Sequence, residues 1–272
     1  MPFLASRPHA QPRAVIIGAP YDATSTFRKG SREAPAAIRW ASESIETYSP
    51  TQDLDLEDLP LADAGDIDLD GCTCEKAVNR VAQAITAQSG FPLMLGGEHT
   101  LTVGAIKAAL ARHPDLAVLA LDAHLDLRDQ YEGSAWSHAT TFARVLDFLP
   151  QDRVAILGAR SGTREEWIRA NSMLAVSRCG RLDDKAWSAL AGRPLYLTVD
   201  IDAFDASIAP GTGNPEPLGL EVEDFVRILD RLRDATVVGA DVVEVNPTYD
   251  PSGRTAVLAA WLVREMLLGF AL

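Results

Sequence analysis

The chain has 272 residues, 47% of them hydrophobic, so a large buried core is expected and intrinsic disorder is not. Its formal net charge of -13 argues against nucleic acid or an anionic membrane as a partner and agrees with a small cationic substrate. Cys72, Cys74 and Cys179 form neither a disulfide framework nor a complete zinc site, and the N-terminus lacks the apolar core of a signal peptide, so a cytoplasmic protein is expected.

Short apolar runs alternate with helical patterns along the chain. Strands are predicted at residues 15–17, 93–95, 116–121, 154–157, 195–199 and 236–243. Helices are predicted at residues 35–48, 73–89, 100–113, 221–233 and 256–272, and another follows the capping box formed by Thr163 and Glu166. The last helix carries Arg264 and Glu265 within its apolar run, which indicates a buried amphipathic helix rather than a membrane span.

Strand–helix alternation of this kind predicts a three-layer α/β/α fold with a mostly parallel central sheet. No repeat or linker interrupts it, so residues 1–272 are expected to form a single domain. The acidic run of Asp63, Asp66, Asp68 and Asp70 lacks the spacing of a calcium loop and is interpreted as a solvated loop.

Side chains that can bind metals follow four of the predicted strands. In such folds functional groups lie beyond the carboxyl ends of the strands. The stretch Asp122-Ala123-His124-Leu125-Asp126 is the most informative, because alternate residues of an extended strand point the same way. The other strand ends supply His99, the pair Asp200 and Asp202, and Glu244.

Each of these motifs has an ordinary structural explanation when it stands alone, such as a turn or a helix cap. Together they predict a hard, carboxylate-rich site with two imidazoles, which suits Mn²⁺ or another first-row divalent ion better than a thiolate-bound zinc. Four aspartates and two histidines are too many for one ion. They suit two ions about 3.5–4 Å apart that share carboxylates.

These residues resemble the ureohydrolases, the family of arginase, agmatinase and their relatives. The resemblance runs from about Val15 to the C-terminus. It rests on Gly-Gly-Glu-His (96–99), Asp-Ala-His-Leu-Asp (122–126), Ser-His-Ala-Thr (137–140), Val-Asp-Ile-Asp (199–202), Ala-Pro-Gly-Thr-Gly-Asn-Pro-Glu-Pro (209–217) and Val-Val-Glu-Val-Asn-Pro (242–247). It implies an arginase-like fold with a sheet of about eight strands, two Mn²⁺ per chain, hydrolysis of a guanidino or amidino group, and a homo-trimer or hexamer.

The resemblance also implies a role for each matching residue. One ion would be held by His99, Asp122, Asp126 and Asp200, and the other by His124, Asp122, Asp200 and Asp202. A hydroxide between the ions would attack the guanidinium carbon, and Asp126 would pass its proton to the leaving amine. Glu244 would orient the guanidinium, His138 would exchange protons with solvent, and Asn214 would lie beside the substrate.

The expected substrate is agmatine, which would give putrescine and urea. The segment at 209–217 is more similar to agmatinases than to arginases, and Arg128 stands where arginases typically have an asparagine that binds the substrate carboxylate. Glu98 is a further departure, since the family commonly has aspartate there. Guanidinobutyrate, arginine and formiminoglutamate stay open as substrates. So do a catalytically idle metal-binding protein and a one-metal deacetylase.

Overall fold

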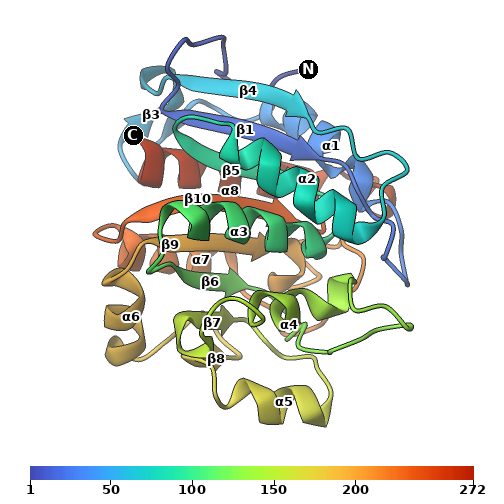
Figure 1. Ribbon diagram of the computed structural model, residues 1–272. Helices are drawn as coiled ribbons and strands as arrows, with labels where there is room; N and C mark the ends of the chain where they lie inside the picture. The colour runs from blue at the N-terminus through green and yellow to red at the C-terminus, as the bar shows by residue number, and fades with distance from the viewer.

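A parallel sheet of eight strands forms the centre of the computed structural model, which describes residues 1–272 (Figure 1). Its strand order is β4-β1-β5-β10-β9-β6-β7-β8. The strands are β1 (Ala14–Ala19), β4 (Leu61–Asp66), β5 (Phe91–Gly96), β6 (Ala117–Leu121), β7 (Val154–Leu157), β8 (Ala175–Ser177), β9 (Leu195–Asp200) and β10 (Val237–Val243). Every neighbouring pair is parallel, which confirms the predicted fold class.

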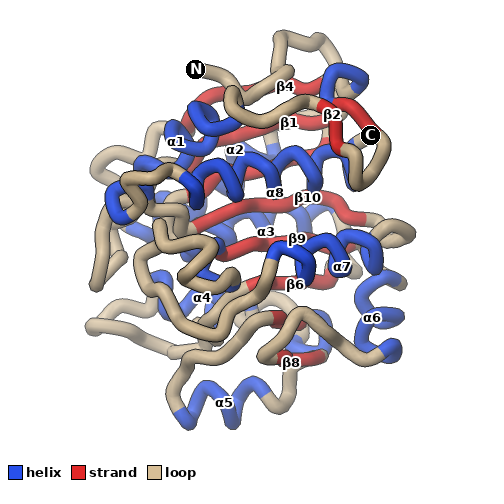
Figure 2. The backbone as a smooth tube through the Cα atoms, turned by 180° about the vertical axis from the view of Figure 1, so that it is seen from behind, coloured by secondary structure: helices blue, strands red, loops and turns tan.

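Helices cover both faces of this sheet, as the two opposite views show (Figures 1 and 2). They are α1 (Ala34–Ser42), α2 (Cys74–Thr86), α3 (Thr102–Arg112), α4 (Thr141–Val145), α5 (Arg164–Ala170), α6 (Asp184–Ala191), α7 (Val222–Leu232) and α8 (Arg254–Ala271). Helices α2 and α3 pack against each other on one face, and α1 and α8 pack against each other on the opposite face.

The two faces bury separate hydrophobic cores, and each strand contributes to both. In β1, Val15 and Ile17 belong to the core under α2 and α3, whereas Ala14 and Ile16 belong to the core under α1 and α8. Successive strand side chains point to opposite faces, so a strand buried on both sides needs a continuous apolar run. This explains why the apolar runs of the sequence predict the central strands well.

The helix predicted at residues 35–48 is shorter than expected. Helix α1 ends at Ser42, and Tyr48 begins β2 (Tyr48–Ser49), which pairs with β3 (Leu54–Asp55) in a separate antiparallel hairpin. The hydroxyl of Ser42 donates to the carbonyl of Arg39, and that of Ser44 donates to the carbonyl of Ala41. Serine hydroxyls that bond nearby carbonyls compete with helix continuation.

The prediction of a solvated loop at Asp63 and Asp66 is wrong, because both lie in the edge strand β4. The Asp63 side chain is only 3% exposed and receives two hydrogen bonds of 2.8 Å from the Arg39 guanidinium. Asp68 and Asp70, which follow the strand, are exposed as expected. A strand with so few apolar residues has no periodic signal, and its partner Arg39 lies far away in the sequence.

The C-terminal helix α8 is buried, as predicted. Arg264 is 5% exposed and Glu265 is fully buried, and the two side chains form an ion pair of 2.6 Å within the helix. None of the helices combines the length and the apolar character needed to span a bilayer.

Candidate metal centre

The candidate site lies beyond the carboxyl ends of four adjacent strands, β5, β10, β9 and β6. Parallel strands end at one edge of the sheet, so residues far apart in the sequence meet there. Strand β5 is followed by His99, β10 by Glu244 and β6 by Asp122, while Asp200 is the last residue of β9.

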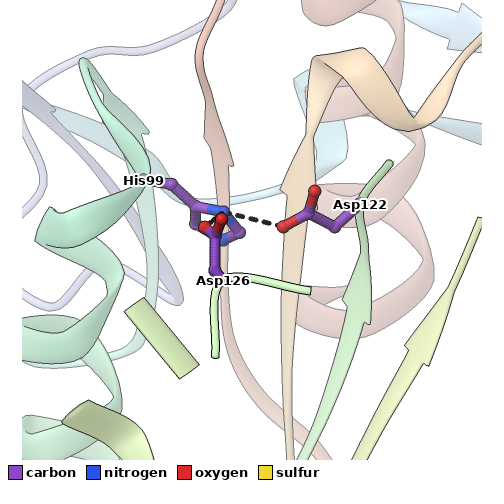
Figure 3. Close-up of side chains that lie close together, drawn as sticks. All are labelled: His99, Asp122 and Asp126. Carbon is purple, nitrogen blue, oxygen red and sulfur yellow. Dashed lines mark ion pairs between the residues drawn. The ribbon is translucent and has the colours of Figure 1, made fainter. Parts of the chain in front are cut away.

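The first group of candidate ligands surrounds the imidazole of His99, which is 1% exposed (Figure 3). Its Nδ1 atom lies 3.0 Å from Oδ2 of Asp122, 3.3 Å from Oδ2 of Asp200 and 3.5 Å from Oδ2 of Asp126. The structure therefore brings together the four side chains that the ureohydrolase resemblance assigns to one ion.

The second group surrounds the imidazole of His124. Its Nδ1 atom lies 2.9 Å from Oδ2 of Asp202 and 3.7 Å from Oδ1 of Asp122. Asp122 thus belongs to both groups, each of which could hold a metal ion. Asp122 therefore lies where two ions could share it. Asp200, for which the resemblance implies the same sharing, lies within 4 Å of the His99 imidazole but not of the His124 imidazole.

Two buried polar atoms at the centre, Nδ1 of His99 and Oδ2 of Asp122, lie 3.0 Å apart, at ion-pair distance, but neither makes a hydrogen bond of acceptable geometry. They face each other, and an unsatisfied buried polar atom costs free energy. Burial raises the pKa of Asp200 well above its usual value, and the neighbouring charges of Asp202 and Asp122 add to this effect. Divalent cations bound among these oxygen and nitrogen atoms would satisfy the orphaned atoms and offset the carboxylate repulsion, so the residues fit a binuclear centre.

The partners of His99 leave its Nδ1 atom free for a metal. Nε2 of His99 lies 3.1 Å from the hydroxyl of Thr198, which itself donates to Asp241 at 2.5 Å. Because the Thr198 proton is used there, its oxygen accepts a hydrogen bond from Nε2, and in the neutral imidazole Nδ1 then keeps its lone pair for a metal. Tyr196 donates a second hydrogen bond to Asp241, at 2.9 Å. This buried chain orients the imidazole in the way that outer partners usually orient metal-bound histidines.

The backbone of the Asp122–Asp126 stretch differs from the expected extended strand. Strand β6 ends at Leu121, and Asp126 adopts a left-handed conformation with φ of 48°. Asp126 reaches the centre through this turn rather than through strand alternation. Glu244 is also left-handed, with φ of 61°. Such conformations are uncommon for residues other than glycine, and they concentrate at functional sites.

Glu244 is fixed in place beside His99. Its Oε1 atom accepts a hydrogen bond of 2.7 Å from the backbone N–H of His99, and its own N–H donates to the carbonyl of Gly97. Burial raises the pKa of Glu244 to about 8. Its Oε2 atom lies beside Gly213, which has no side chain to cover it. One carboxylate oxygen is therefore used by the protein, and the other is available to a ligand.

His138 is held by a chain of hydrogen bonds that sequence reasoning missed. Its backbone N–H donates to the hydroxyl of Thr24 at 3.0 Å, and that hydroxyl donates to Oε1 of Glu98 at 2.7 Å. Glu98 is fully buried and also accepts from Thr100 and from the backbone of Thr24. Burial lowers the pKa of His138 to about 4, so its imidazole is neutral near pH 7.

A cavity of about 320 Å³ connects these groups, a size typical of small-molecule sites. Five of the six candidate ligands line it, and Asp122 lies fully buried behind them. His138, Asn214 and Glu244 line it as well, so the structure places every predicted site residue in or directly behind one cavity. Arg128 and Glu216 also line it. Glu216 belongs to the motif at residues 209–217, but nothing in that motif shows which side chains face the cavity.

Comparison with known proteins agrees with this site. Residues 12–269 match the arginase family. The agmatinase of Bacillus subtilis is 39% identical over 98% of this chain and 96% of its own length. The guanidinobutyrase of Pseudomonas aeruginosa is 34% identical over 93% of this chain and 85% of its own. The crystal structure of agmatine ureohydrolase of Thermoplasma volcanium superposes with a TM-score of 0.90 at 33% identity, covering 98% of this chain and 93% of that one.

This chain belongs to the arginase family and has the family's α/β fold. The two groups of histidine and aspartate side chains are consistent with a binuclear metal site. The chain is therefore a metal-binding ureohydrolase, of a family that acts on guanidino compounds.

Proposed function

We propose that this protein is a manganese-dependent amidinohydrolase that converts agmatine and water to putrescine and urea. The observation that carries the proposal is the pair of orphaned atoms on His99 and Asp122, which face each other within a ring of carboxylates next to a free oxygen of Glu244. The metal ligands we propose are His99, Asp122, His124, Asp126, Asp200 and Asp202. Two bound Mn²⁺ ions would lower the pKa of water and so provide a nucleophile near neutral pH.

The side chains around the cavity have separate tasks in this reaction. Glu244 accepts hydrogen bonds from the guanidinium NH₂ groups, which orients the carbon for attack and places a negative charge beside a cation. Asn214 lines the same cavity and contacts the substrate there. Water adds to the guanidinium carbon, the bond from that carbon to the alkyl nitrogen breaks, and the products are urea and the amine.

Two side chains move the protons. Asp126 lines the cavity beside the other carboxylates, where one of its oxygens can hold the proton and release it to the leaving amine. The neutral imidazole of His138 lines the same cavity and exchanges protons with solvent. We further propose that the protein acts in the cytoplasm as a homo-trimer or hexamer; its three cysteines are free thiols, as a reducing compartment requires.

A second candidate substrate is 4-guanidinobutyrate. Arg128 favours it, because the guanidinium pairs with Glu166 only through Nε, at 3.3 Å, and its terminal nitrogens have no protein partner. Those nitrogens could donate hydrogen bonds to a substrate carboxylate, and guanidinobutyrase is among the similar proteins.

The experiment is a urea-release assay with added Mn²⁺ on agmatine, arginine, 4-guanidinobutyrate and 3-guanidinopropionate, combined with measurement of bound metal. We expect two Mn²⁺ per chain and the highest kcat/KM for agmatine. Two bound ions without urea from any compound would show a catalytically idle protein. One ion per chain with activity on acetylated amines would instead support a deacetylase.

A further inference from the structure

The charges in the cavity indicate which kind of substrate tail fits it. The four candidate aspartate ligands carry a total charge equal and opposite to that of two divalent ions, so these charges balance once the metals are bound. Beyond the candidate ligands, four charged side chains line the cavity: Arg128, Glu166, Glu216 and Glu244. Once Glu244 is ionised, as a guanidinium bound beside it would favour, three acids and one base leave an excess of negative charge. A substrate with two positive charges would offset it.

Arg128 is already paired within this set. Its Nε atom lies 3.3 Å from Oε2 of Glu166, a carboxylate that is 5% exposed. Its guanidinium also lies over the ring of Tyr131, 4.9 Å from the ring centroid. Glu166 is held in turn by the backbone N–H groups of Thr163 and Leu127. The charges of Arg128 and Glu166 therefore cancel, and the excess negative charge of the cavity comes from Glu216 and Glu244.

Glu216 sits on a loop that is pinned to the metal centre by Arg160. The Arg160 guanidinium donates to the carbonyls of Glu216 and Pro217, each at 2.9 Å, and to that of Asp202 at 2.7 Å. It also reaches the carbonyls of Gly158 and Ala203. One half-buried cation thus fixes the backbone of Glu216 relative to a candidate metal ligand.

The side chain of Glu216, in contrast, has no partner of its own. No protein group donates a hydrogen bond to its carboxylate, and the only basic nitrogen within 4.0 Å is Nε2 of His124, at 3.8 Å. The side chain is 35% exposed and lines the cavity. The backbone of this carboxylate is fixed, and no protein group donates a hydrogen bond to its oxygens. Such a carboxylate can bind a cation without first breaking another interaction.

We propose that Glu216 binds the primary ammonium group at the far end of the substrate, so that the cavity selects guanidino compounds with a cationic tail over guanidino acids. This inference rests on the proposed function, because it names the tail that the same cavity accepts. Glu244 then faces the guanidinium and Glu216 faces the ammonium. The competing explanation is that Glu216 only orients His124 through Nε2, as outer partners of metal-bound histidines do.

The test compares Glu216→Gln with the unaltered enzyme on agmatine and on butylguanidine, which has a similar chain but no ammonium group. The variant should lose roughly ten- to a hundred-fold in kcat/KM for agmatine, mainly through KM, as expected for a lost charge-assisted hydrogen bond. Its kcat/KM for butylguanidine and its manganese content should not change. Glu223→Gln removes the same charge from an exposed position of α7 and should leave both substrates unaffected.

The other outcomes overturn the inference. Equal losses on both substrates, or loss of manganese, would show that Glu216 acts through His124. An unchanged preference, or an unaltered enzyme that prefers 4-guanidinobutyrate to agmatine, would show that no ammonium is bound there. Absence of urea from every guanidino compound would instead refute the proposed function, and the inference with it.

Discussion

Two buried clusters of charged side chains in this molecule have opposite hydrogen-bonding states. At the edge of the sheet, Asp63 accepts two hydrogen bonds from Arg39 and one each from the backbone N–H groups of Phe3 and Gly65. At the carboxyl ends of the central strands, carboxylates outnumber their donors, and atoms of His99 and Asp122 make no hydrogen bond of acceptable geometry. Both clusters are largely buried, but only the first has all its carboxylate oxygens hydrogen-bonded.

The difference separates stability from function. A buried ion pair with every oxygen satisfied can be retained for the fold alone. Buried polar atoms without partners are tolerated where a bound ligand completes them, and the left-handed backbone of Asp126 and Glu244 lies in that same region. Substitutions in the two clusters should therefore have different consequences.

The largest effect is expected for Asp122→Asn. This change removes one charge from the centre of both ligand groups, so manganese binding should weaken at both positions. Loss of a residue that only hydrogen-bonds to a metal ligand lowers activity by up to roughly 100-fold. Because Asp122 is itself a proposed ligand, urea release should fall by more than that. Without metal, the variant should unfold at a lower temperature than the metal-free parent, because burial opposes ionisation of Asp122 but the two histidines beside it outweigh burial and hold the pKa of this carboxyl below its usual value. Metal analysis, the urea assay and thermal unfolding measure these three quantities.

The matched control is Asp68→Asn, at an exposed position after β4, which should change none of them. Full activity in Asp122→Asn would contradict the proposal that this carboxylate is shared between two ions.

A different pattern is expected for Arg39→Met. Removing one partner of a buried ion pair leaves the Asp63 carboxylate uncompensated, and the free energy of unfolding should fall by about 3–5 kcal/mol. Manganese content and the kcat of the folded protein should be unchanged, because the pair lies at the sheet edge. Chemical denaturation of the metal-free protein gives the first quantity. A loss of kcat at unchanged stability would contradict the idea that this cluster serves stability and the metal centre serves function.

The same pair gives a pH dependence of definite sign. Burial opposes ionisation of Asp63, but the hydrogen bonds from Arg39 outweigh it and lower its pKa below 3.8 in the folded chain. The contribution to stability is therefore present above pH 3.8 and is lost as the pH falls through the lower folded value. Arg39→Met should lose that part of the acid sensitivity. An identical pH dependence in both proteins, measured without metal, would show that Asp63 is not the responsible group.

The sequence predicts the central sheet and the candidate ligands for the same reason. Strands buried on both faces need continuous apolar runs, which are visible in the sequence. The candidate ligands directly follow those runs, so their position along the chain is enough to identify them. Edge strand β4 has no such run, and Thr24 and Arg160 act through contacts with residues distant in the sequence. The left-handed turn at Asp126 also leaves no pattern that periodicity could detect.

A smaller effect is expected for Thr24→Val, which breaks the chain from Glu98 to His138. Without the hydroxyl, the His138 N–H loses its acceptor and Glu98 loses a donor. Urea release should fall about ten-fold, within the range for outer partners of a catalytic group, while manganese content stays the same. Thr24→Ser keeps the hydroxyl and should restore most of the activity. Equal activity in the valine and serine variants would show that the chain does not position His138.

The smallest effect is expected for an ion pair outside both clusters. Arg233 lies 2.9 Å from Asp230 at the end of α7, and both side chains are at least 60% exposed. Solvent screens this pair, so Arg233→Gln should change the free energy of unfolding by less than about 1 kcal/mol, and added salt should reduce even that. Arg39 and Arg233 both form close ion pairs with aspartate, and they differ mainly in burial. If Arg233→Gln were as destabilising as Arg39→Met, burial could not be what makes the sheet-edge cluster matter for stability.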